Sequence, residues 1–278
     1  MINNQLSQKE IDYCRTMAGE IRQEVLNMVY RTKSPHVGSC FSMIEILITL
    51  YFKILRINPV LPLDENRDRF ILSKGHGCPA LYSVLVKRGF LDKESIGKFA
   101  VSGGCLEQHP TRDIKRGIEI SSGSLGHGLS IGCGMALAGK HDQSERRIFV
   151  FLGDGELDEG LNWEAAMFAS HNELDNLVAI VDYNRIQVLG KTADVLNLEP
   201  LGDKWRSFGW EVREADGHNF EQLAACLGSV PFQRGKPSVV IAHTIKGKGV
   251  SFMENELCWH DKHPDDREYE KALDELKI

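Results

Sequence analysis

Apolar residues recur at helical spacing near the start of the chain and again in several later segments. Ser7 and Glu10 form a capping box, a pattern that typically begins a helix. The expected buried face of this helix consists of Ile11, Cys14, Met17, Ile21, Val25 and Met28. The same spacing predicts helices over 41–55, 80–90, 125–140, 159–171, 220–227 and 265–278.

Short apolar runs between these helices predict β-strands. They are the runs in "DRFIL", "RIFVFL", "LVAIV", "WEVREA" and "SVVIAHTI". Strands that alternate with helices indicate the α/β class, with a parallel sheet flanked by helices on both faces. No repeat or Pro/Ser-rich linker divides the chain, so residues 1–278 are expected to form a single domain. The stretch over 99–124, rich in Gly, Ser, His and Pro, is long enough for a loop to suggest function.

The composition argues against several classes of protein. The formal net charge of -6 provides no general attraction to nucleic acid or to an anionic membrane. Seven cysteines without a CxxC pair argue against a disulfide framework or a structural zinc site. The N-terminus lacks the apolar core of a secretory signal, and no uncharged apolar run of about 18 residues occurs. We therefore expect a cytoplasmic protein with no membrane or nucleic-acid partner.

The turn "GDG" at 153–155 follows one of the predicted strands directly. Asn184 stands thirty positions after Asp154, just beyond the next strand. A right-handed βαβ crossover makes these two strands parallel, so Asp154 and Asn184 are expected side by side at one edge of the sheet. A carboxylate, an amide oxygen and a nearby carbonyl such as that of Ile186 are suitable ligands for Mg²⁺ or Ca²⁺. Gly153 and Gly155 allow a phosphate to approach the main chain.

This unit therefore predicts a site for a metal ion and a diphosphate. An isolated GDG is most often only a tight turn, but the preceding strand and the spacing to Asn184 favour a functional site. No GxGxxG follows a predicted strand, which disfavours a dinucleotide site.

In these motifs the sequence resembles the transketolases, which use thiamine diphosphate. The resemblance covers about residues 15–263 and includes "LSKGHG", "SSGSLGHG", the GDG-to-Asn unit and "CWHDKHP". It implies that Asp154, Asn184 and the Ile186 carbonyl hold the metal. It also implies cofactor contacts from a wider set, namely His76, Gly123, Leu125, Gly155, Glu159, Asn184 and His260.

The resemblance also places several histidines in the active site. They are His36, His76, His109 and His260. Ketol transfer moves protons to and from sugar oxygens, and histidine titrates near the working pH. His127 and His263 stay open: the family often has glutamine at the first, and the second competes with His260. Lys246 and Lys248 add phosphate attraction.

The helix after the metal turn carries both apolar and acidic residues. Trp163, Met167 and Phe168 have core spacing and are expected to pack inside the protein. Glu159 and Glu164 match acidic residues that the family buries near its dimer contact. Because they are five positions apart, a shared role requires that the helix lie within an interface.

Full-length transketolases continue into a pyrimidine-binding domain and a C-terminal domain, which this sequence lacks. The resemblance implies the N-terminal subunit of a two-chain transketolase, in a heterotetramer with two chains of each kind. The reaction implied is transfer of a two-carbon ketol unit from a ketose phosphate to an aldose, as in the pentose phosphate pathway. Alternatives are a ketol transferase for an unusual sugar phosphate, an enzyme like deoxyxylulose-phosphate synthase, or a silent thiamine diphosphate-binding regulatory subunit. The glutamate of "DGELDEG" favours transketolase over the synthase.

Overall fold

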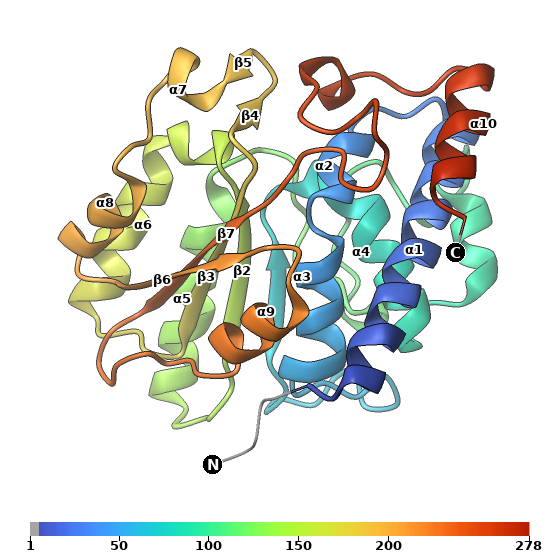
Figure 1. Cartoon of the computed structure of the whole chain (residues 1–278). Coiled ribbons are helices and arrows are strands. Elements are labelled where there is room, and N and C mark those ends of the chain that lie inside the picture. The colour runs from blue at the N-terminus through green and yellow to red at the C-terminus, as the bar shows by residue number, and fades with distance from the viewer. Residues whose placement is uncertain (1–5, 278) are drawn as a thin grey trace.

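A five-stranded parallel sheet forms the centre of the molecule in the computed structural model, which describes residues 6–277 (Figure 1). In spatial order the strands are β1 (Arg69–Leu72), β2 (Ile148–Gly153), β3 (Leu177–Tyr183), β7 (Ser238–His243) and β6 (Glu211–Asp216). Every neighbouring pair is parallel, so all the strands end at the same edge of the sheet. The predicted α/β class and its strands are confirmed.

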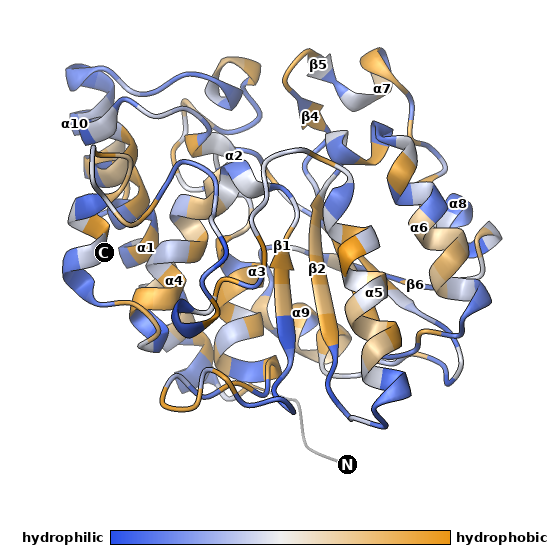
Figure 2. Cartoon of the chain, turned by 180° about the vertical axis from the view of Figure 1, so that it is seen from behind, coloured by the Kyte–Doolittle hydropathy of each residue, from blue (hydrophilic) through white to orange (hydrophobic). Residues whose placement is uncertain are grey.

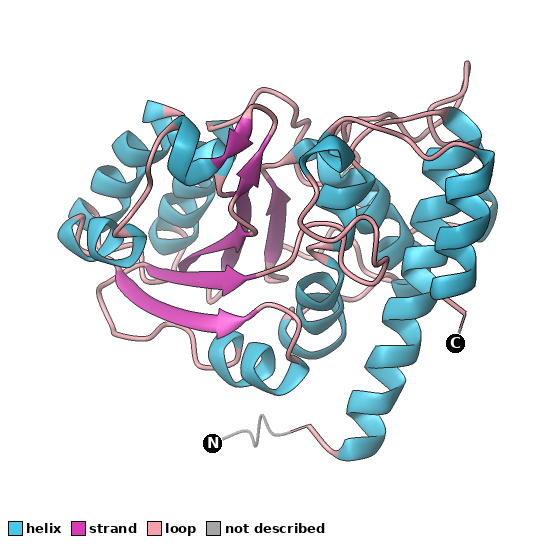
Figure 3. Cartoon of the chain, turned by 45° about the horizontal axis from the view of Figure 1, so that its top comes forward, coloured by secondary structure: helices cyan, strands magenta, loops and turns pink. Residues whose placement is uncertain are grey.

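Helices cover both faces of the sheet because the central strands are apolar on both sides (Figures 2 and 3). In β2, Phe149 and Phe151 join one hydrophobic cluster, whereas Val150 and Leu152 join the other. The helices of the first cluster are α1 (Gln8–Thr32), α3 (Ile44–Thr49), α4 (Cys78–Arg88) and α9 (Phe220–Leu227). Those of the second are α5 (His127–His141), α6 (Gly160–His171) and α8 (Leu201–Ser207). The last helix, α10 (Asp266–Glu275), packs against α1.

The N-terminal helix begins where its capping box predicts. Ser7 Oγ accepts a hydrogen bond from the Glu10 amide at 3.4 Å, and the Glu10 carboxylate accepts one from the Ser7 amide at 2.9 Å. All the apolar residues predicted for the buried face of α1 are buried. Neither this helix nor any other within residues 6–277 has the apolar length needed to cross a membrane.

The single helix predicted over 41–55 is wrong. The chain instead forms α2 (Val37–Phe41), α3 and a π-helical turn over Leu50–Ile54. Every residue from 37 to 51 is buried, so packing from all sides sets the path of this segment. Gly38 lies so close to Trp259 that a Cβ would come within 2.8 Å of the Trp259 carbonyl oxygen. This close approach holds α2 at the carboxyl edge of the sheet.

Between β3 and β6 the chain forms elements that the hydrophobic pattern does not predict. They are β4 (Ile186–Gln187), β5 (Gly190–Lys191), α7 (Thr192–Val195) and α8. The β4–β5 hairpin stands beyond the carboxyl edge of the sheet, and its tip exposes Val188 and Leu189 (Figure 1).

The outer face of α6 also departs from the prediction. Met167 and Phe168, expected in the core, are exposed, because the helix turns this side away from the sheet. Trp163 does pack inside, with its ring stacked 5.4 Å from that of Phe208. Phe168 lines a shallow groove of about 370 Å³ between α5 and α6.

The long loop over 99–124 contains little regular structure beyond one short 3₁₀ turn at Ile114–Arg116. Buried side chains nevertheless anchor it. The Arg67 guanidinium donates to the Glu119 carboxylate, and both side chains are about 5% exposed. The Ser122 amide donates to the Pro110 carbonyl at 3.1 Å. These contacts set the path of the loop into the carboxyl edge.

Candidate functional site

A cleft of about 290 Å³ opens at the carboxyl edge of the sheet. Its walls come from strand tips, the 99–124 loop, the β4–β5 hairpin and the segments around α2 and 244–260. The lining residues include ten of the predicted site residues, namely His36, His76, His109, Gly123, Leu125, Asp154, Gly155, Asn184, Ile186 and His260. The chain thus brings together residues that are up to 224 positions apart.

The tips of β2 and β3 lie side by side, as the βαβ crossover predicts. Asp154 accepts a hydrogen bond at Oδ1 from the Gly155 amide at 2.7 Å, and at Oδ2 from the Arg185 amide. Asn184 Oδ1 accepts from the Ile186 amide at 3.1 Å. Gly155 is required sterically, because a Cβ there would lie 2.6 Å from the Cβ of Gln187, a neighbour in the hairpin. One carboxylate, one amide and one backbone carbonyl therefore line this end of the cleft.

A buried ion pair lies directly below these strand tips. Asp182, within β3, accepts from the Lys74 ammonium and from Ser42 Oγ at Oδ2, and from Thr244 Oγ1 at Oδ1. Burial alone would raise the pKa of Asp182, but the Lys74 ammonium and these hydrogen bonds hold it below the usual value. Asp182 is therefore a charged group that orients Lys74 at the base of the cleft.

The charges at this end of the cleft fit a metal ion and a diphosphate. Burial raises the pKa of Asp154 to about 7, and the Asp182 carboxylate contributes. Burial also lowers the pKa of Lys246 to about 8, and the Lys74 ammonium contributes. The Lys246 ammonium lies 3.3 Å from the Ile186 carbonyl oxygen. A divalent cation would favour the ionised carboxylate, and phosphate oxygens would favour both ammonium groups.

Glu156 braces the backbone around the cleft. Its Oε1 accepts from the Gly126 amide at 2.9 Å and from the Ser73 hydroxyl, and its Oε2 accepts from the Gly153 amide at 3.1 Å. Ser73 Oγ in turn accepts from the Gly128 amide at 3.1 Å. One buried carboxylate thus ties the tip of β1, the GDG turn and the start of α5 to one another.

Three histidine rings, those of His36, His76 and His260, form a cluster in the wall of the cleft. The ring centroids of His36 lie 5.0 Å from His76 and 5.4 Å from His260. His36 Nδ1 is 2.7 Å from the His260 carbonyl oxygen, so this nitrogen donates and Nε2 is left as the acceptor. Within residues 6–277, His260 Nδ1 is buried without a hydrogen-bond partner.

The pKa values of all three imidazoles are lowered. Burial lowers the pKa of His36 below its usual value, and burial with the Lys74 charge lowers that of His76 much further. Burial and the Lys246 ammonium lower the pKa of His260 to about 3. The cluster is therefore neutral at pH 7, and neutral imidazole can accept a proton.

The remaining predicted residues divide between the cleft and the surface. His109 is on the cleft wall beside Gly123, where a Cβ would lie 3.4 Å from its ring. Glu159 is exposed at the start of α6 and does not line the cleft, so the structure does not support its predicted cofactor contact. His127 and His263 are also exposed and do not line the cleft. Of His260 and His263, the two candidates for one active-site role, only His260 lines the cleft.

Three charged residues of this site were not predicted from the sequence. They are Lys74, Glu156 and Asp182. Asp182 had a usable signal, because a carboxylate inside the apolar run "LVAIVDY" must be paired when buried. The roles of Lys74 and Glu156 depend on partners distant in sequence, so local spacing does not reveal them.

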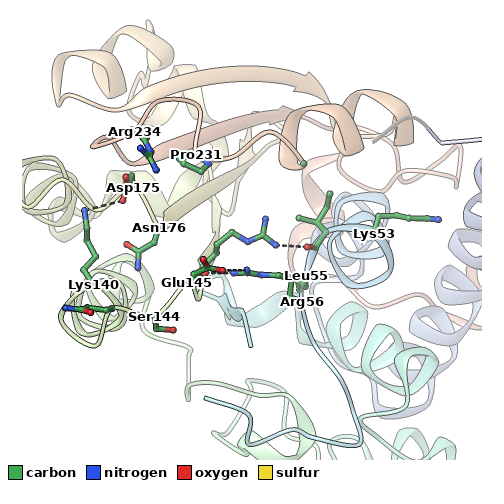
Figure 4. Close-up of a pocket in the computed structure, with 14 residues that line it drawn as sticks. Lys53, Leu55, Arg56, Lys140, Ser144, Glu145, Asp175, Asn176, Pro231 and Arg234 are labelled. Atoms are coloured by element: carbon green, nitrogen blue, oxygen red, sulfur yellow. Dashed lines mark hydrogen bonds and ion pairs between the residues drawn. The ribbon is translucent and has the colours of Figure 1, made fainter. Parts of the chain in front are cut away.

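A larger hollow, of about 890 Å³, lies at the opposite, amino edge of the sheet (Figure 4). Most of its cations form ion pairs with neighbouring acids. Arg56 and Arg147 both bind the fully buried Asp68, and Lys140 lies 3.2 Å from Asp175. None of the predicted site residues lines this hollow, so size alone does not identify the functional site.

A parallel sheet with an oxygen-rich and lysine-lined cleft at its carboxyl edge defines a phosphate-binding α/β domain. Over residues 14–272 the chain matches the family described as "Transketolase, thiamine diphosphate binding domain". This chain belongs to the transketolase family and corresponds to its N-terminal, thiamine diphosphate-binding part.

Named relatives agree with this assignment. The chain is 43% identical to a subunit of "Apulose-4-phosphate transketolase" from Phocaeicola vulgatus, over 92% of this chain and 90% of that protein. It is 41% identical to "6-deoxy-6-sulfo-D-fructose transketolase subunit SqwG" of Clostridium sp., over 98% of each chain. Solved transketolases share the fold: the Leishmania mexicana enzyme superposes with a TM-score of 0.87 at 26% identity, covering 95% of this chain.

The lengths of these relatives separate two types of chain. This chain spans 41% of the Leishmania mexicana enzyme, about two fifths, but nearly all of the proteins named as subunits. The prediction of a transketolase-type enzyme subunit that binds thiamine diphosphate is confirmed. The names of these two relatives describe those proteins as subunits.

Proposed function

We propose that this chain and a second subunit together transfer a two-carbon ketol unit from a ketose phosphate to an aldose. The supporting observation is the cleft, which combines metal-type oxygen ligands, two buried lysines and a neutral histidine cluster. Thiamine diphosphate supplies the electron sink for cleaving the carbon–carbon bond. The protein supplies binding, orientation and proton transfer.

The phosphate end of the cleft is formed by Asp154, Asn184 and the Ile186 carbonyl, which would hold Mg²⁺ or Ca²⁺. These are hard oxygen donors, and Mg²⁺ typically shares its shell between protein and phosphate oxygens. The Gly155 amide lies at the opening of the 3₁₀ turn that leads into α6 and would face the diphosphate. Lys246 adds positive charge beside the same oxygens.

The histidines would handle the protons of the sugar. Because burial keeps His36, His76 and His260 neutral, each has one ring nitrogen that can accept a hydrogen bond from a sugar hydroxyl, and His76 and His260 each have one that can donate to a sugar oxygen. His109 is more exposed and lies beside Gly123, where the resemblance places the aminopyrimidine ring.

The partner would be a chain that carries the pyrimidine-binding and C-terminal domains. We infer a heterotetramer with two chains of each kind. Exposed apolar residues support such contacts at two places, Val188 and Leu189 on the hairpin beside the cleft, and Met167 and Phe168 on α6. We further propose a cytoplasmic location, in keeping with seven free cysteines.

The sugar is better sought among unusual phosphorylated or sulfonated ketoses than assumed to belong to the pentose phosphate pathway. The relatives named for apulose 4-phosphate and 6-deoxy-6-sulfo-D-fructose are 43% and 41% identical, whereas human transketolase is 36% identical. A ketol transferase for such a sugar is therefore the second candidate, and it uses the same cleft residues.

Co-expression with a chain that contains the pyrimidine-binding and C-terminal domains tests the proposal. Each chain and the mixture are assayed for ketol transfer with thiamine diphosphate, Mg²⁺ and a panel of ketose donors and aldose acceptors. Activity in the mixture alone is the expected result. Cofactor binding without transfer on any sugar would instead indicate a silent regulatory subunit, and activity with pyruvate plus glyceraldehyde 3-phosphate would indicate a synthase.

A further inference from the structure

A network of three buried side chains lies behind the cleft, outside the residues described so far. Arg22 of α1 donates from Nη2 to Glu45 Oε1 at 2.7 Å, and His218 Nδ1 is 2.9 Å from Glu45 Oε2. The side chains of Arg22, Glu45 and His218 are 7%, 9% and 12% exposed. They come from α1, α3 and the turn before α9, so the network joins elements that are distant in sequence.

The hydrogen bonds allow only one protonation pattern for His218. Its Nε2 accepts from the Ile245 amide at 2.8 Å and therefore carries no proton. Nδ1 must then be the protonated nitrogen that donates to the Glu45 carboxylate. Arg22 uses Nε to donate to the Lys248 carbonyl at 2.7 Å. The network thus holds the 245–248 segment at both ends, through the amide of Ile245 and the carbonyl of Lys248.

Lys246 lies between these two attachment points. Its side chain reaches the cleft, where Nζ donates to Ser39 Oγ at 3.1 Å and lies 3.3 Å from the Ile186 carbonyl oxygen. The segment lies beyond β7 and has no helix or strand of its own, and Gly247 has a left-handed φ of 76°. A segment without ladder hydrogen bonds keeps one conformation only if side chains or neighbouring loops restrain it.

We infer that Arg22, Glu45 and His218 are positioning residues that place the Lys246 ammonium at the metal and diphosphate end of the cleft. The identity of the ligands near Lys246, a metal ion and a diphosphate, rests on the proposed function. The geometry of the chain itself carries the positioning, because each member of the network makes a hydrogen bond to the next or to the 245–248 backbone.

Two substitutions of one residue separate positioning from general packing. In His218→Gln the side-chain oxygen can take the place of Nε2 and still accept from the Ile245 amide. In His218→Asn the amide can take the place of Nδ1 and donate to Glu45, but the bond to Ile245 is lost. Hydrogen exchange of the full chain without added ligand is the first measurement. We expect faster exchange across 245–248 in His218→Asn, and near-native exchange in His218→Gln.

Binding of inorganic diphosphate with Mg²⁺, followed by calorimetry, is the second measurement. We expect His218→Asn to bind about tenfold more weakly than the native chain, the size of effect expected from one buried hydrogen bond. In a Lys246→Met background the same substitution should cause no further loss, because it acts through Lys246. Arg22→Gln, which loses the hydrogen bond from Arg22 Nε to the Lys248 carbonyl, serves as a second variant if His218→Asn does not fold.

Distinct outcomes separate failure of the inference from failure of the proposed function. Equal exchange over 245–248 in the Asn and Gln variants, or an additive loss of affinity in the Lys246→Met background, overturns the positioning role. If the native chain does not bind diphosphate with Mg²⁺, the proposed function is contradicted, and the exchange measurement alone still decides whether the network positions the segment.

Discussion

Two hollows of this protein lie at opposite edges of one sheet and differ in how their charged groups are paired. At the amino edge is the 890 Å³ hollow (Figure 4), and two of its arginines, Arg56 and Arg147, bind Asp68, which is fully buried. At the carboxyl edge, the 290 Å³ cleft holds Asp154 and Lys246 with strongly shifted pKa values. The buried carboxylate at the amino edge is paired within the chain, whereas the buried charges at the carboxyl edge can be stabilised further by a ligand.

The difference teaches that cavity size is a poor guide to function in this fold. Buried charges that are paired within the chain stabilise or specify structure, while buried charges with displaced pKa values are typical of functional sites. Parallel sheets also place loops and helix N-termini at the carboxyl edge, which favours binding there. The comparison therefore predicts opposite consequences for mutations at the two edges.

The largest contrast is expected from removing one carboxylate at each edge. Asp154→Ala should abolish Mg²⁺-dependent binding of thiamine diphosphate, because it removes the only side-chain carboxylate among the proposed metal ligands. Its unfolding free energy should fall by about 1–3 kcal/mol, because the Gly155 and Arg185 amides lose their acceptor. The matched control is Asp175→Ala at the amino edge, where the Lys140 pair and the hydrogen bond from the Gly235 amide are lost. Calorimetry that shows unchanged cofactor affinity in Asp154→Ala would contradict the assignment.

Removing the Asp68 carboxylate at the amino edge should lower stability rather than cofactor binding. Asp68→Ala leaves two arginines without their shared partner. We expect the unfolding free energy to fall by about 3 kcal/mol. This value is at the lower end of the range for breaking a buried ion pair, because Arg56 is half exposed. Cofactor affinity should not change. Urea unfolding measures the loss, and Glu145→Ala, at an almost fully exposed position, is the control with little effect. A native-like midpoint in Asp68→Ala would show that the pairing contributes nothing.

The next prediction compares histidines that line the cleft with one that lies outside it. His260→Ala and His109→Ala should lower kcat by about 100-fold, as expected for a lost acid–base group, with a smaller change in cofactor affinity. His263→Ala, exposed and outside the cleft lining, is the control. Steady-state kinetics with the partner chain provide the measurement. Wild-type turnover in both variants would remove these histidines from the catalytic set.

The smallest effect concerns pH. Burial alone would raise the pKa of Asp68, but the hydrogen bonds from Arg147 and Arg56 hold it below its usual value. The stabilisation is therefore fully present above about pH 4, the unfolded pKa, and is lost as pH falls through the lower folded pKa. The difference in unfolding free energy between native and Asp68→Asn should shrink below about pH 4. A constant difference down to about pH 2 would contradict this linkage.

Much of the framework follows from local patterns in the sequence. Alternating apolar strands and helices predict the sheet, and the capping box at Ser7 predicts the start of α1. The crossover rule also brings Asp154 and Asn184 together, since it depends only on the order of strand, helix and strand. The path of 37–54 is not predictable in this way, because residues buried on every side show no helical period.

The sequence by itself determined the class of fold, the family and the candidate ligands, because periodicity, turn chemistry and motif spacing are local properties of the chain. Only the tertiary structure decided which side chains share the cleft. It placed Lys74 and Asp182 at the base of the site, left Glu159 outside the cleft lining, and buried Glu156, whose carboxylate holds three backbone segments together. Such contacts depend on burial and on charges contributed from distant segments, and those arise only when the chain is packed.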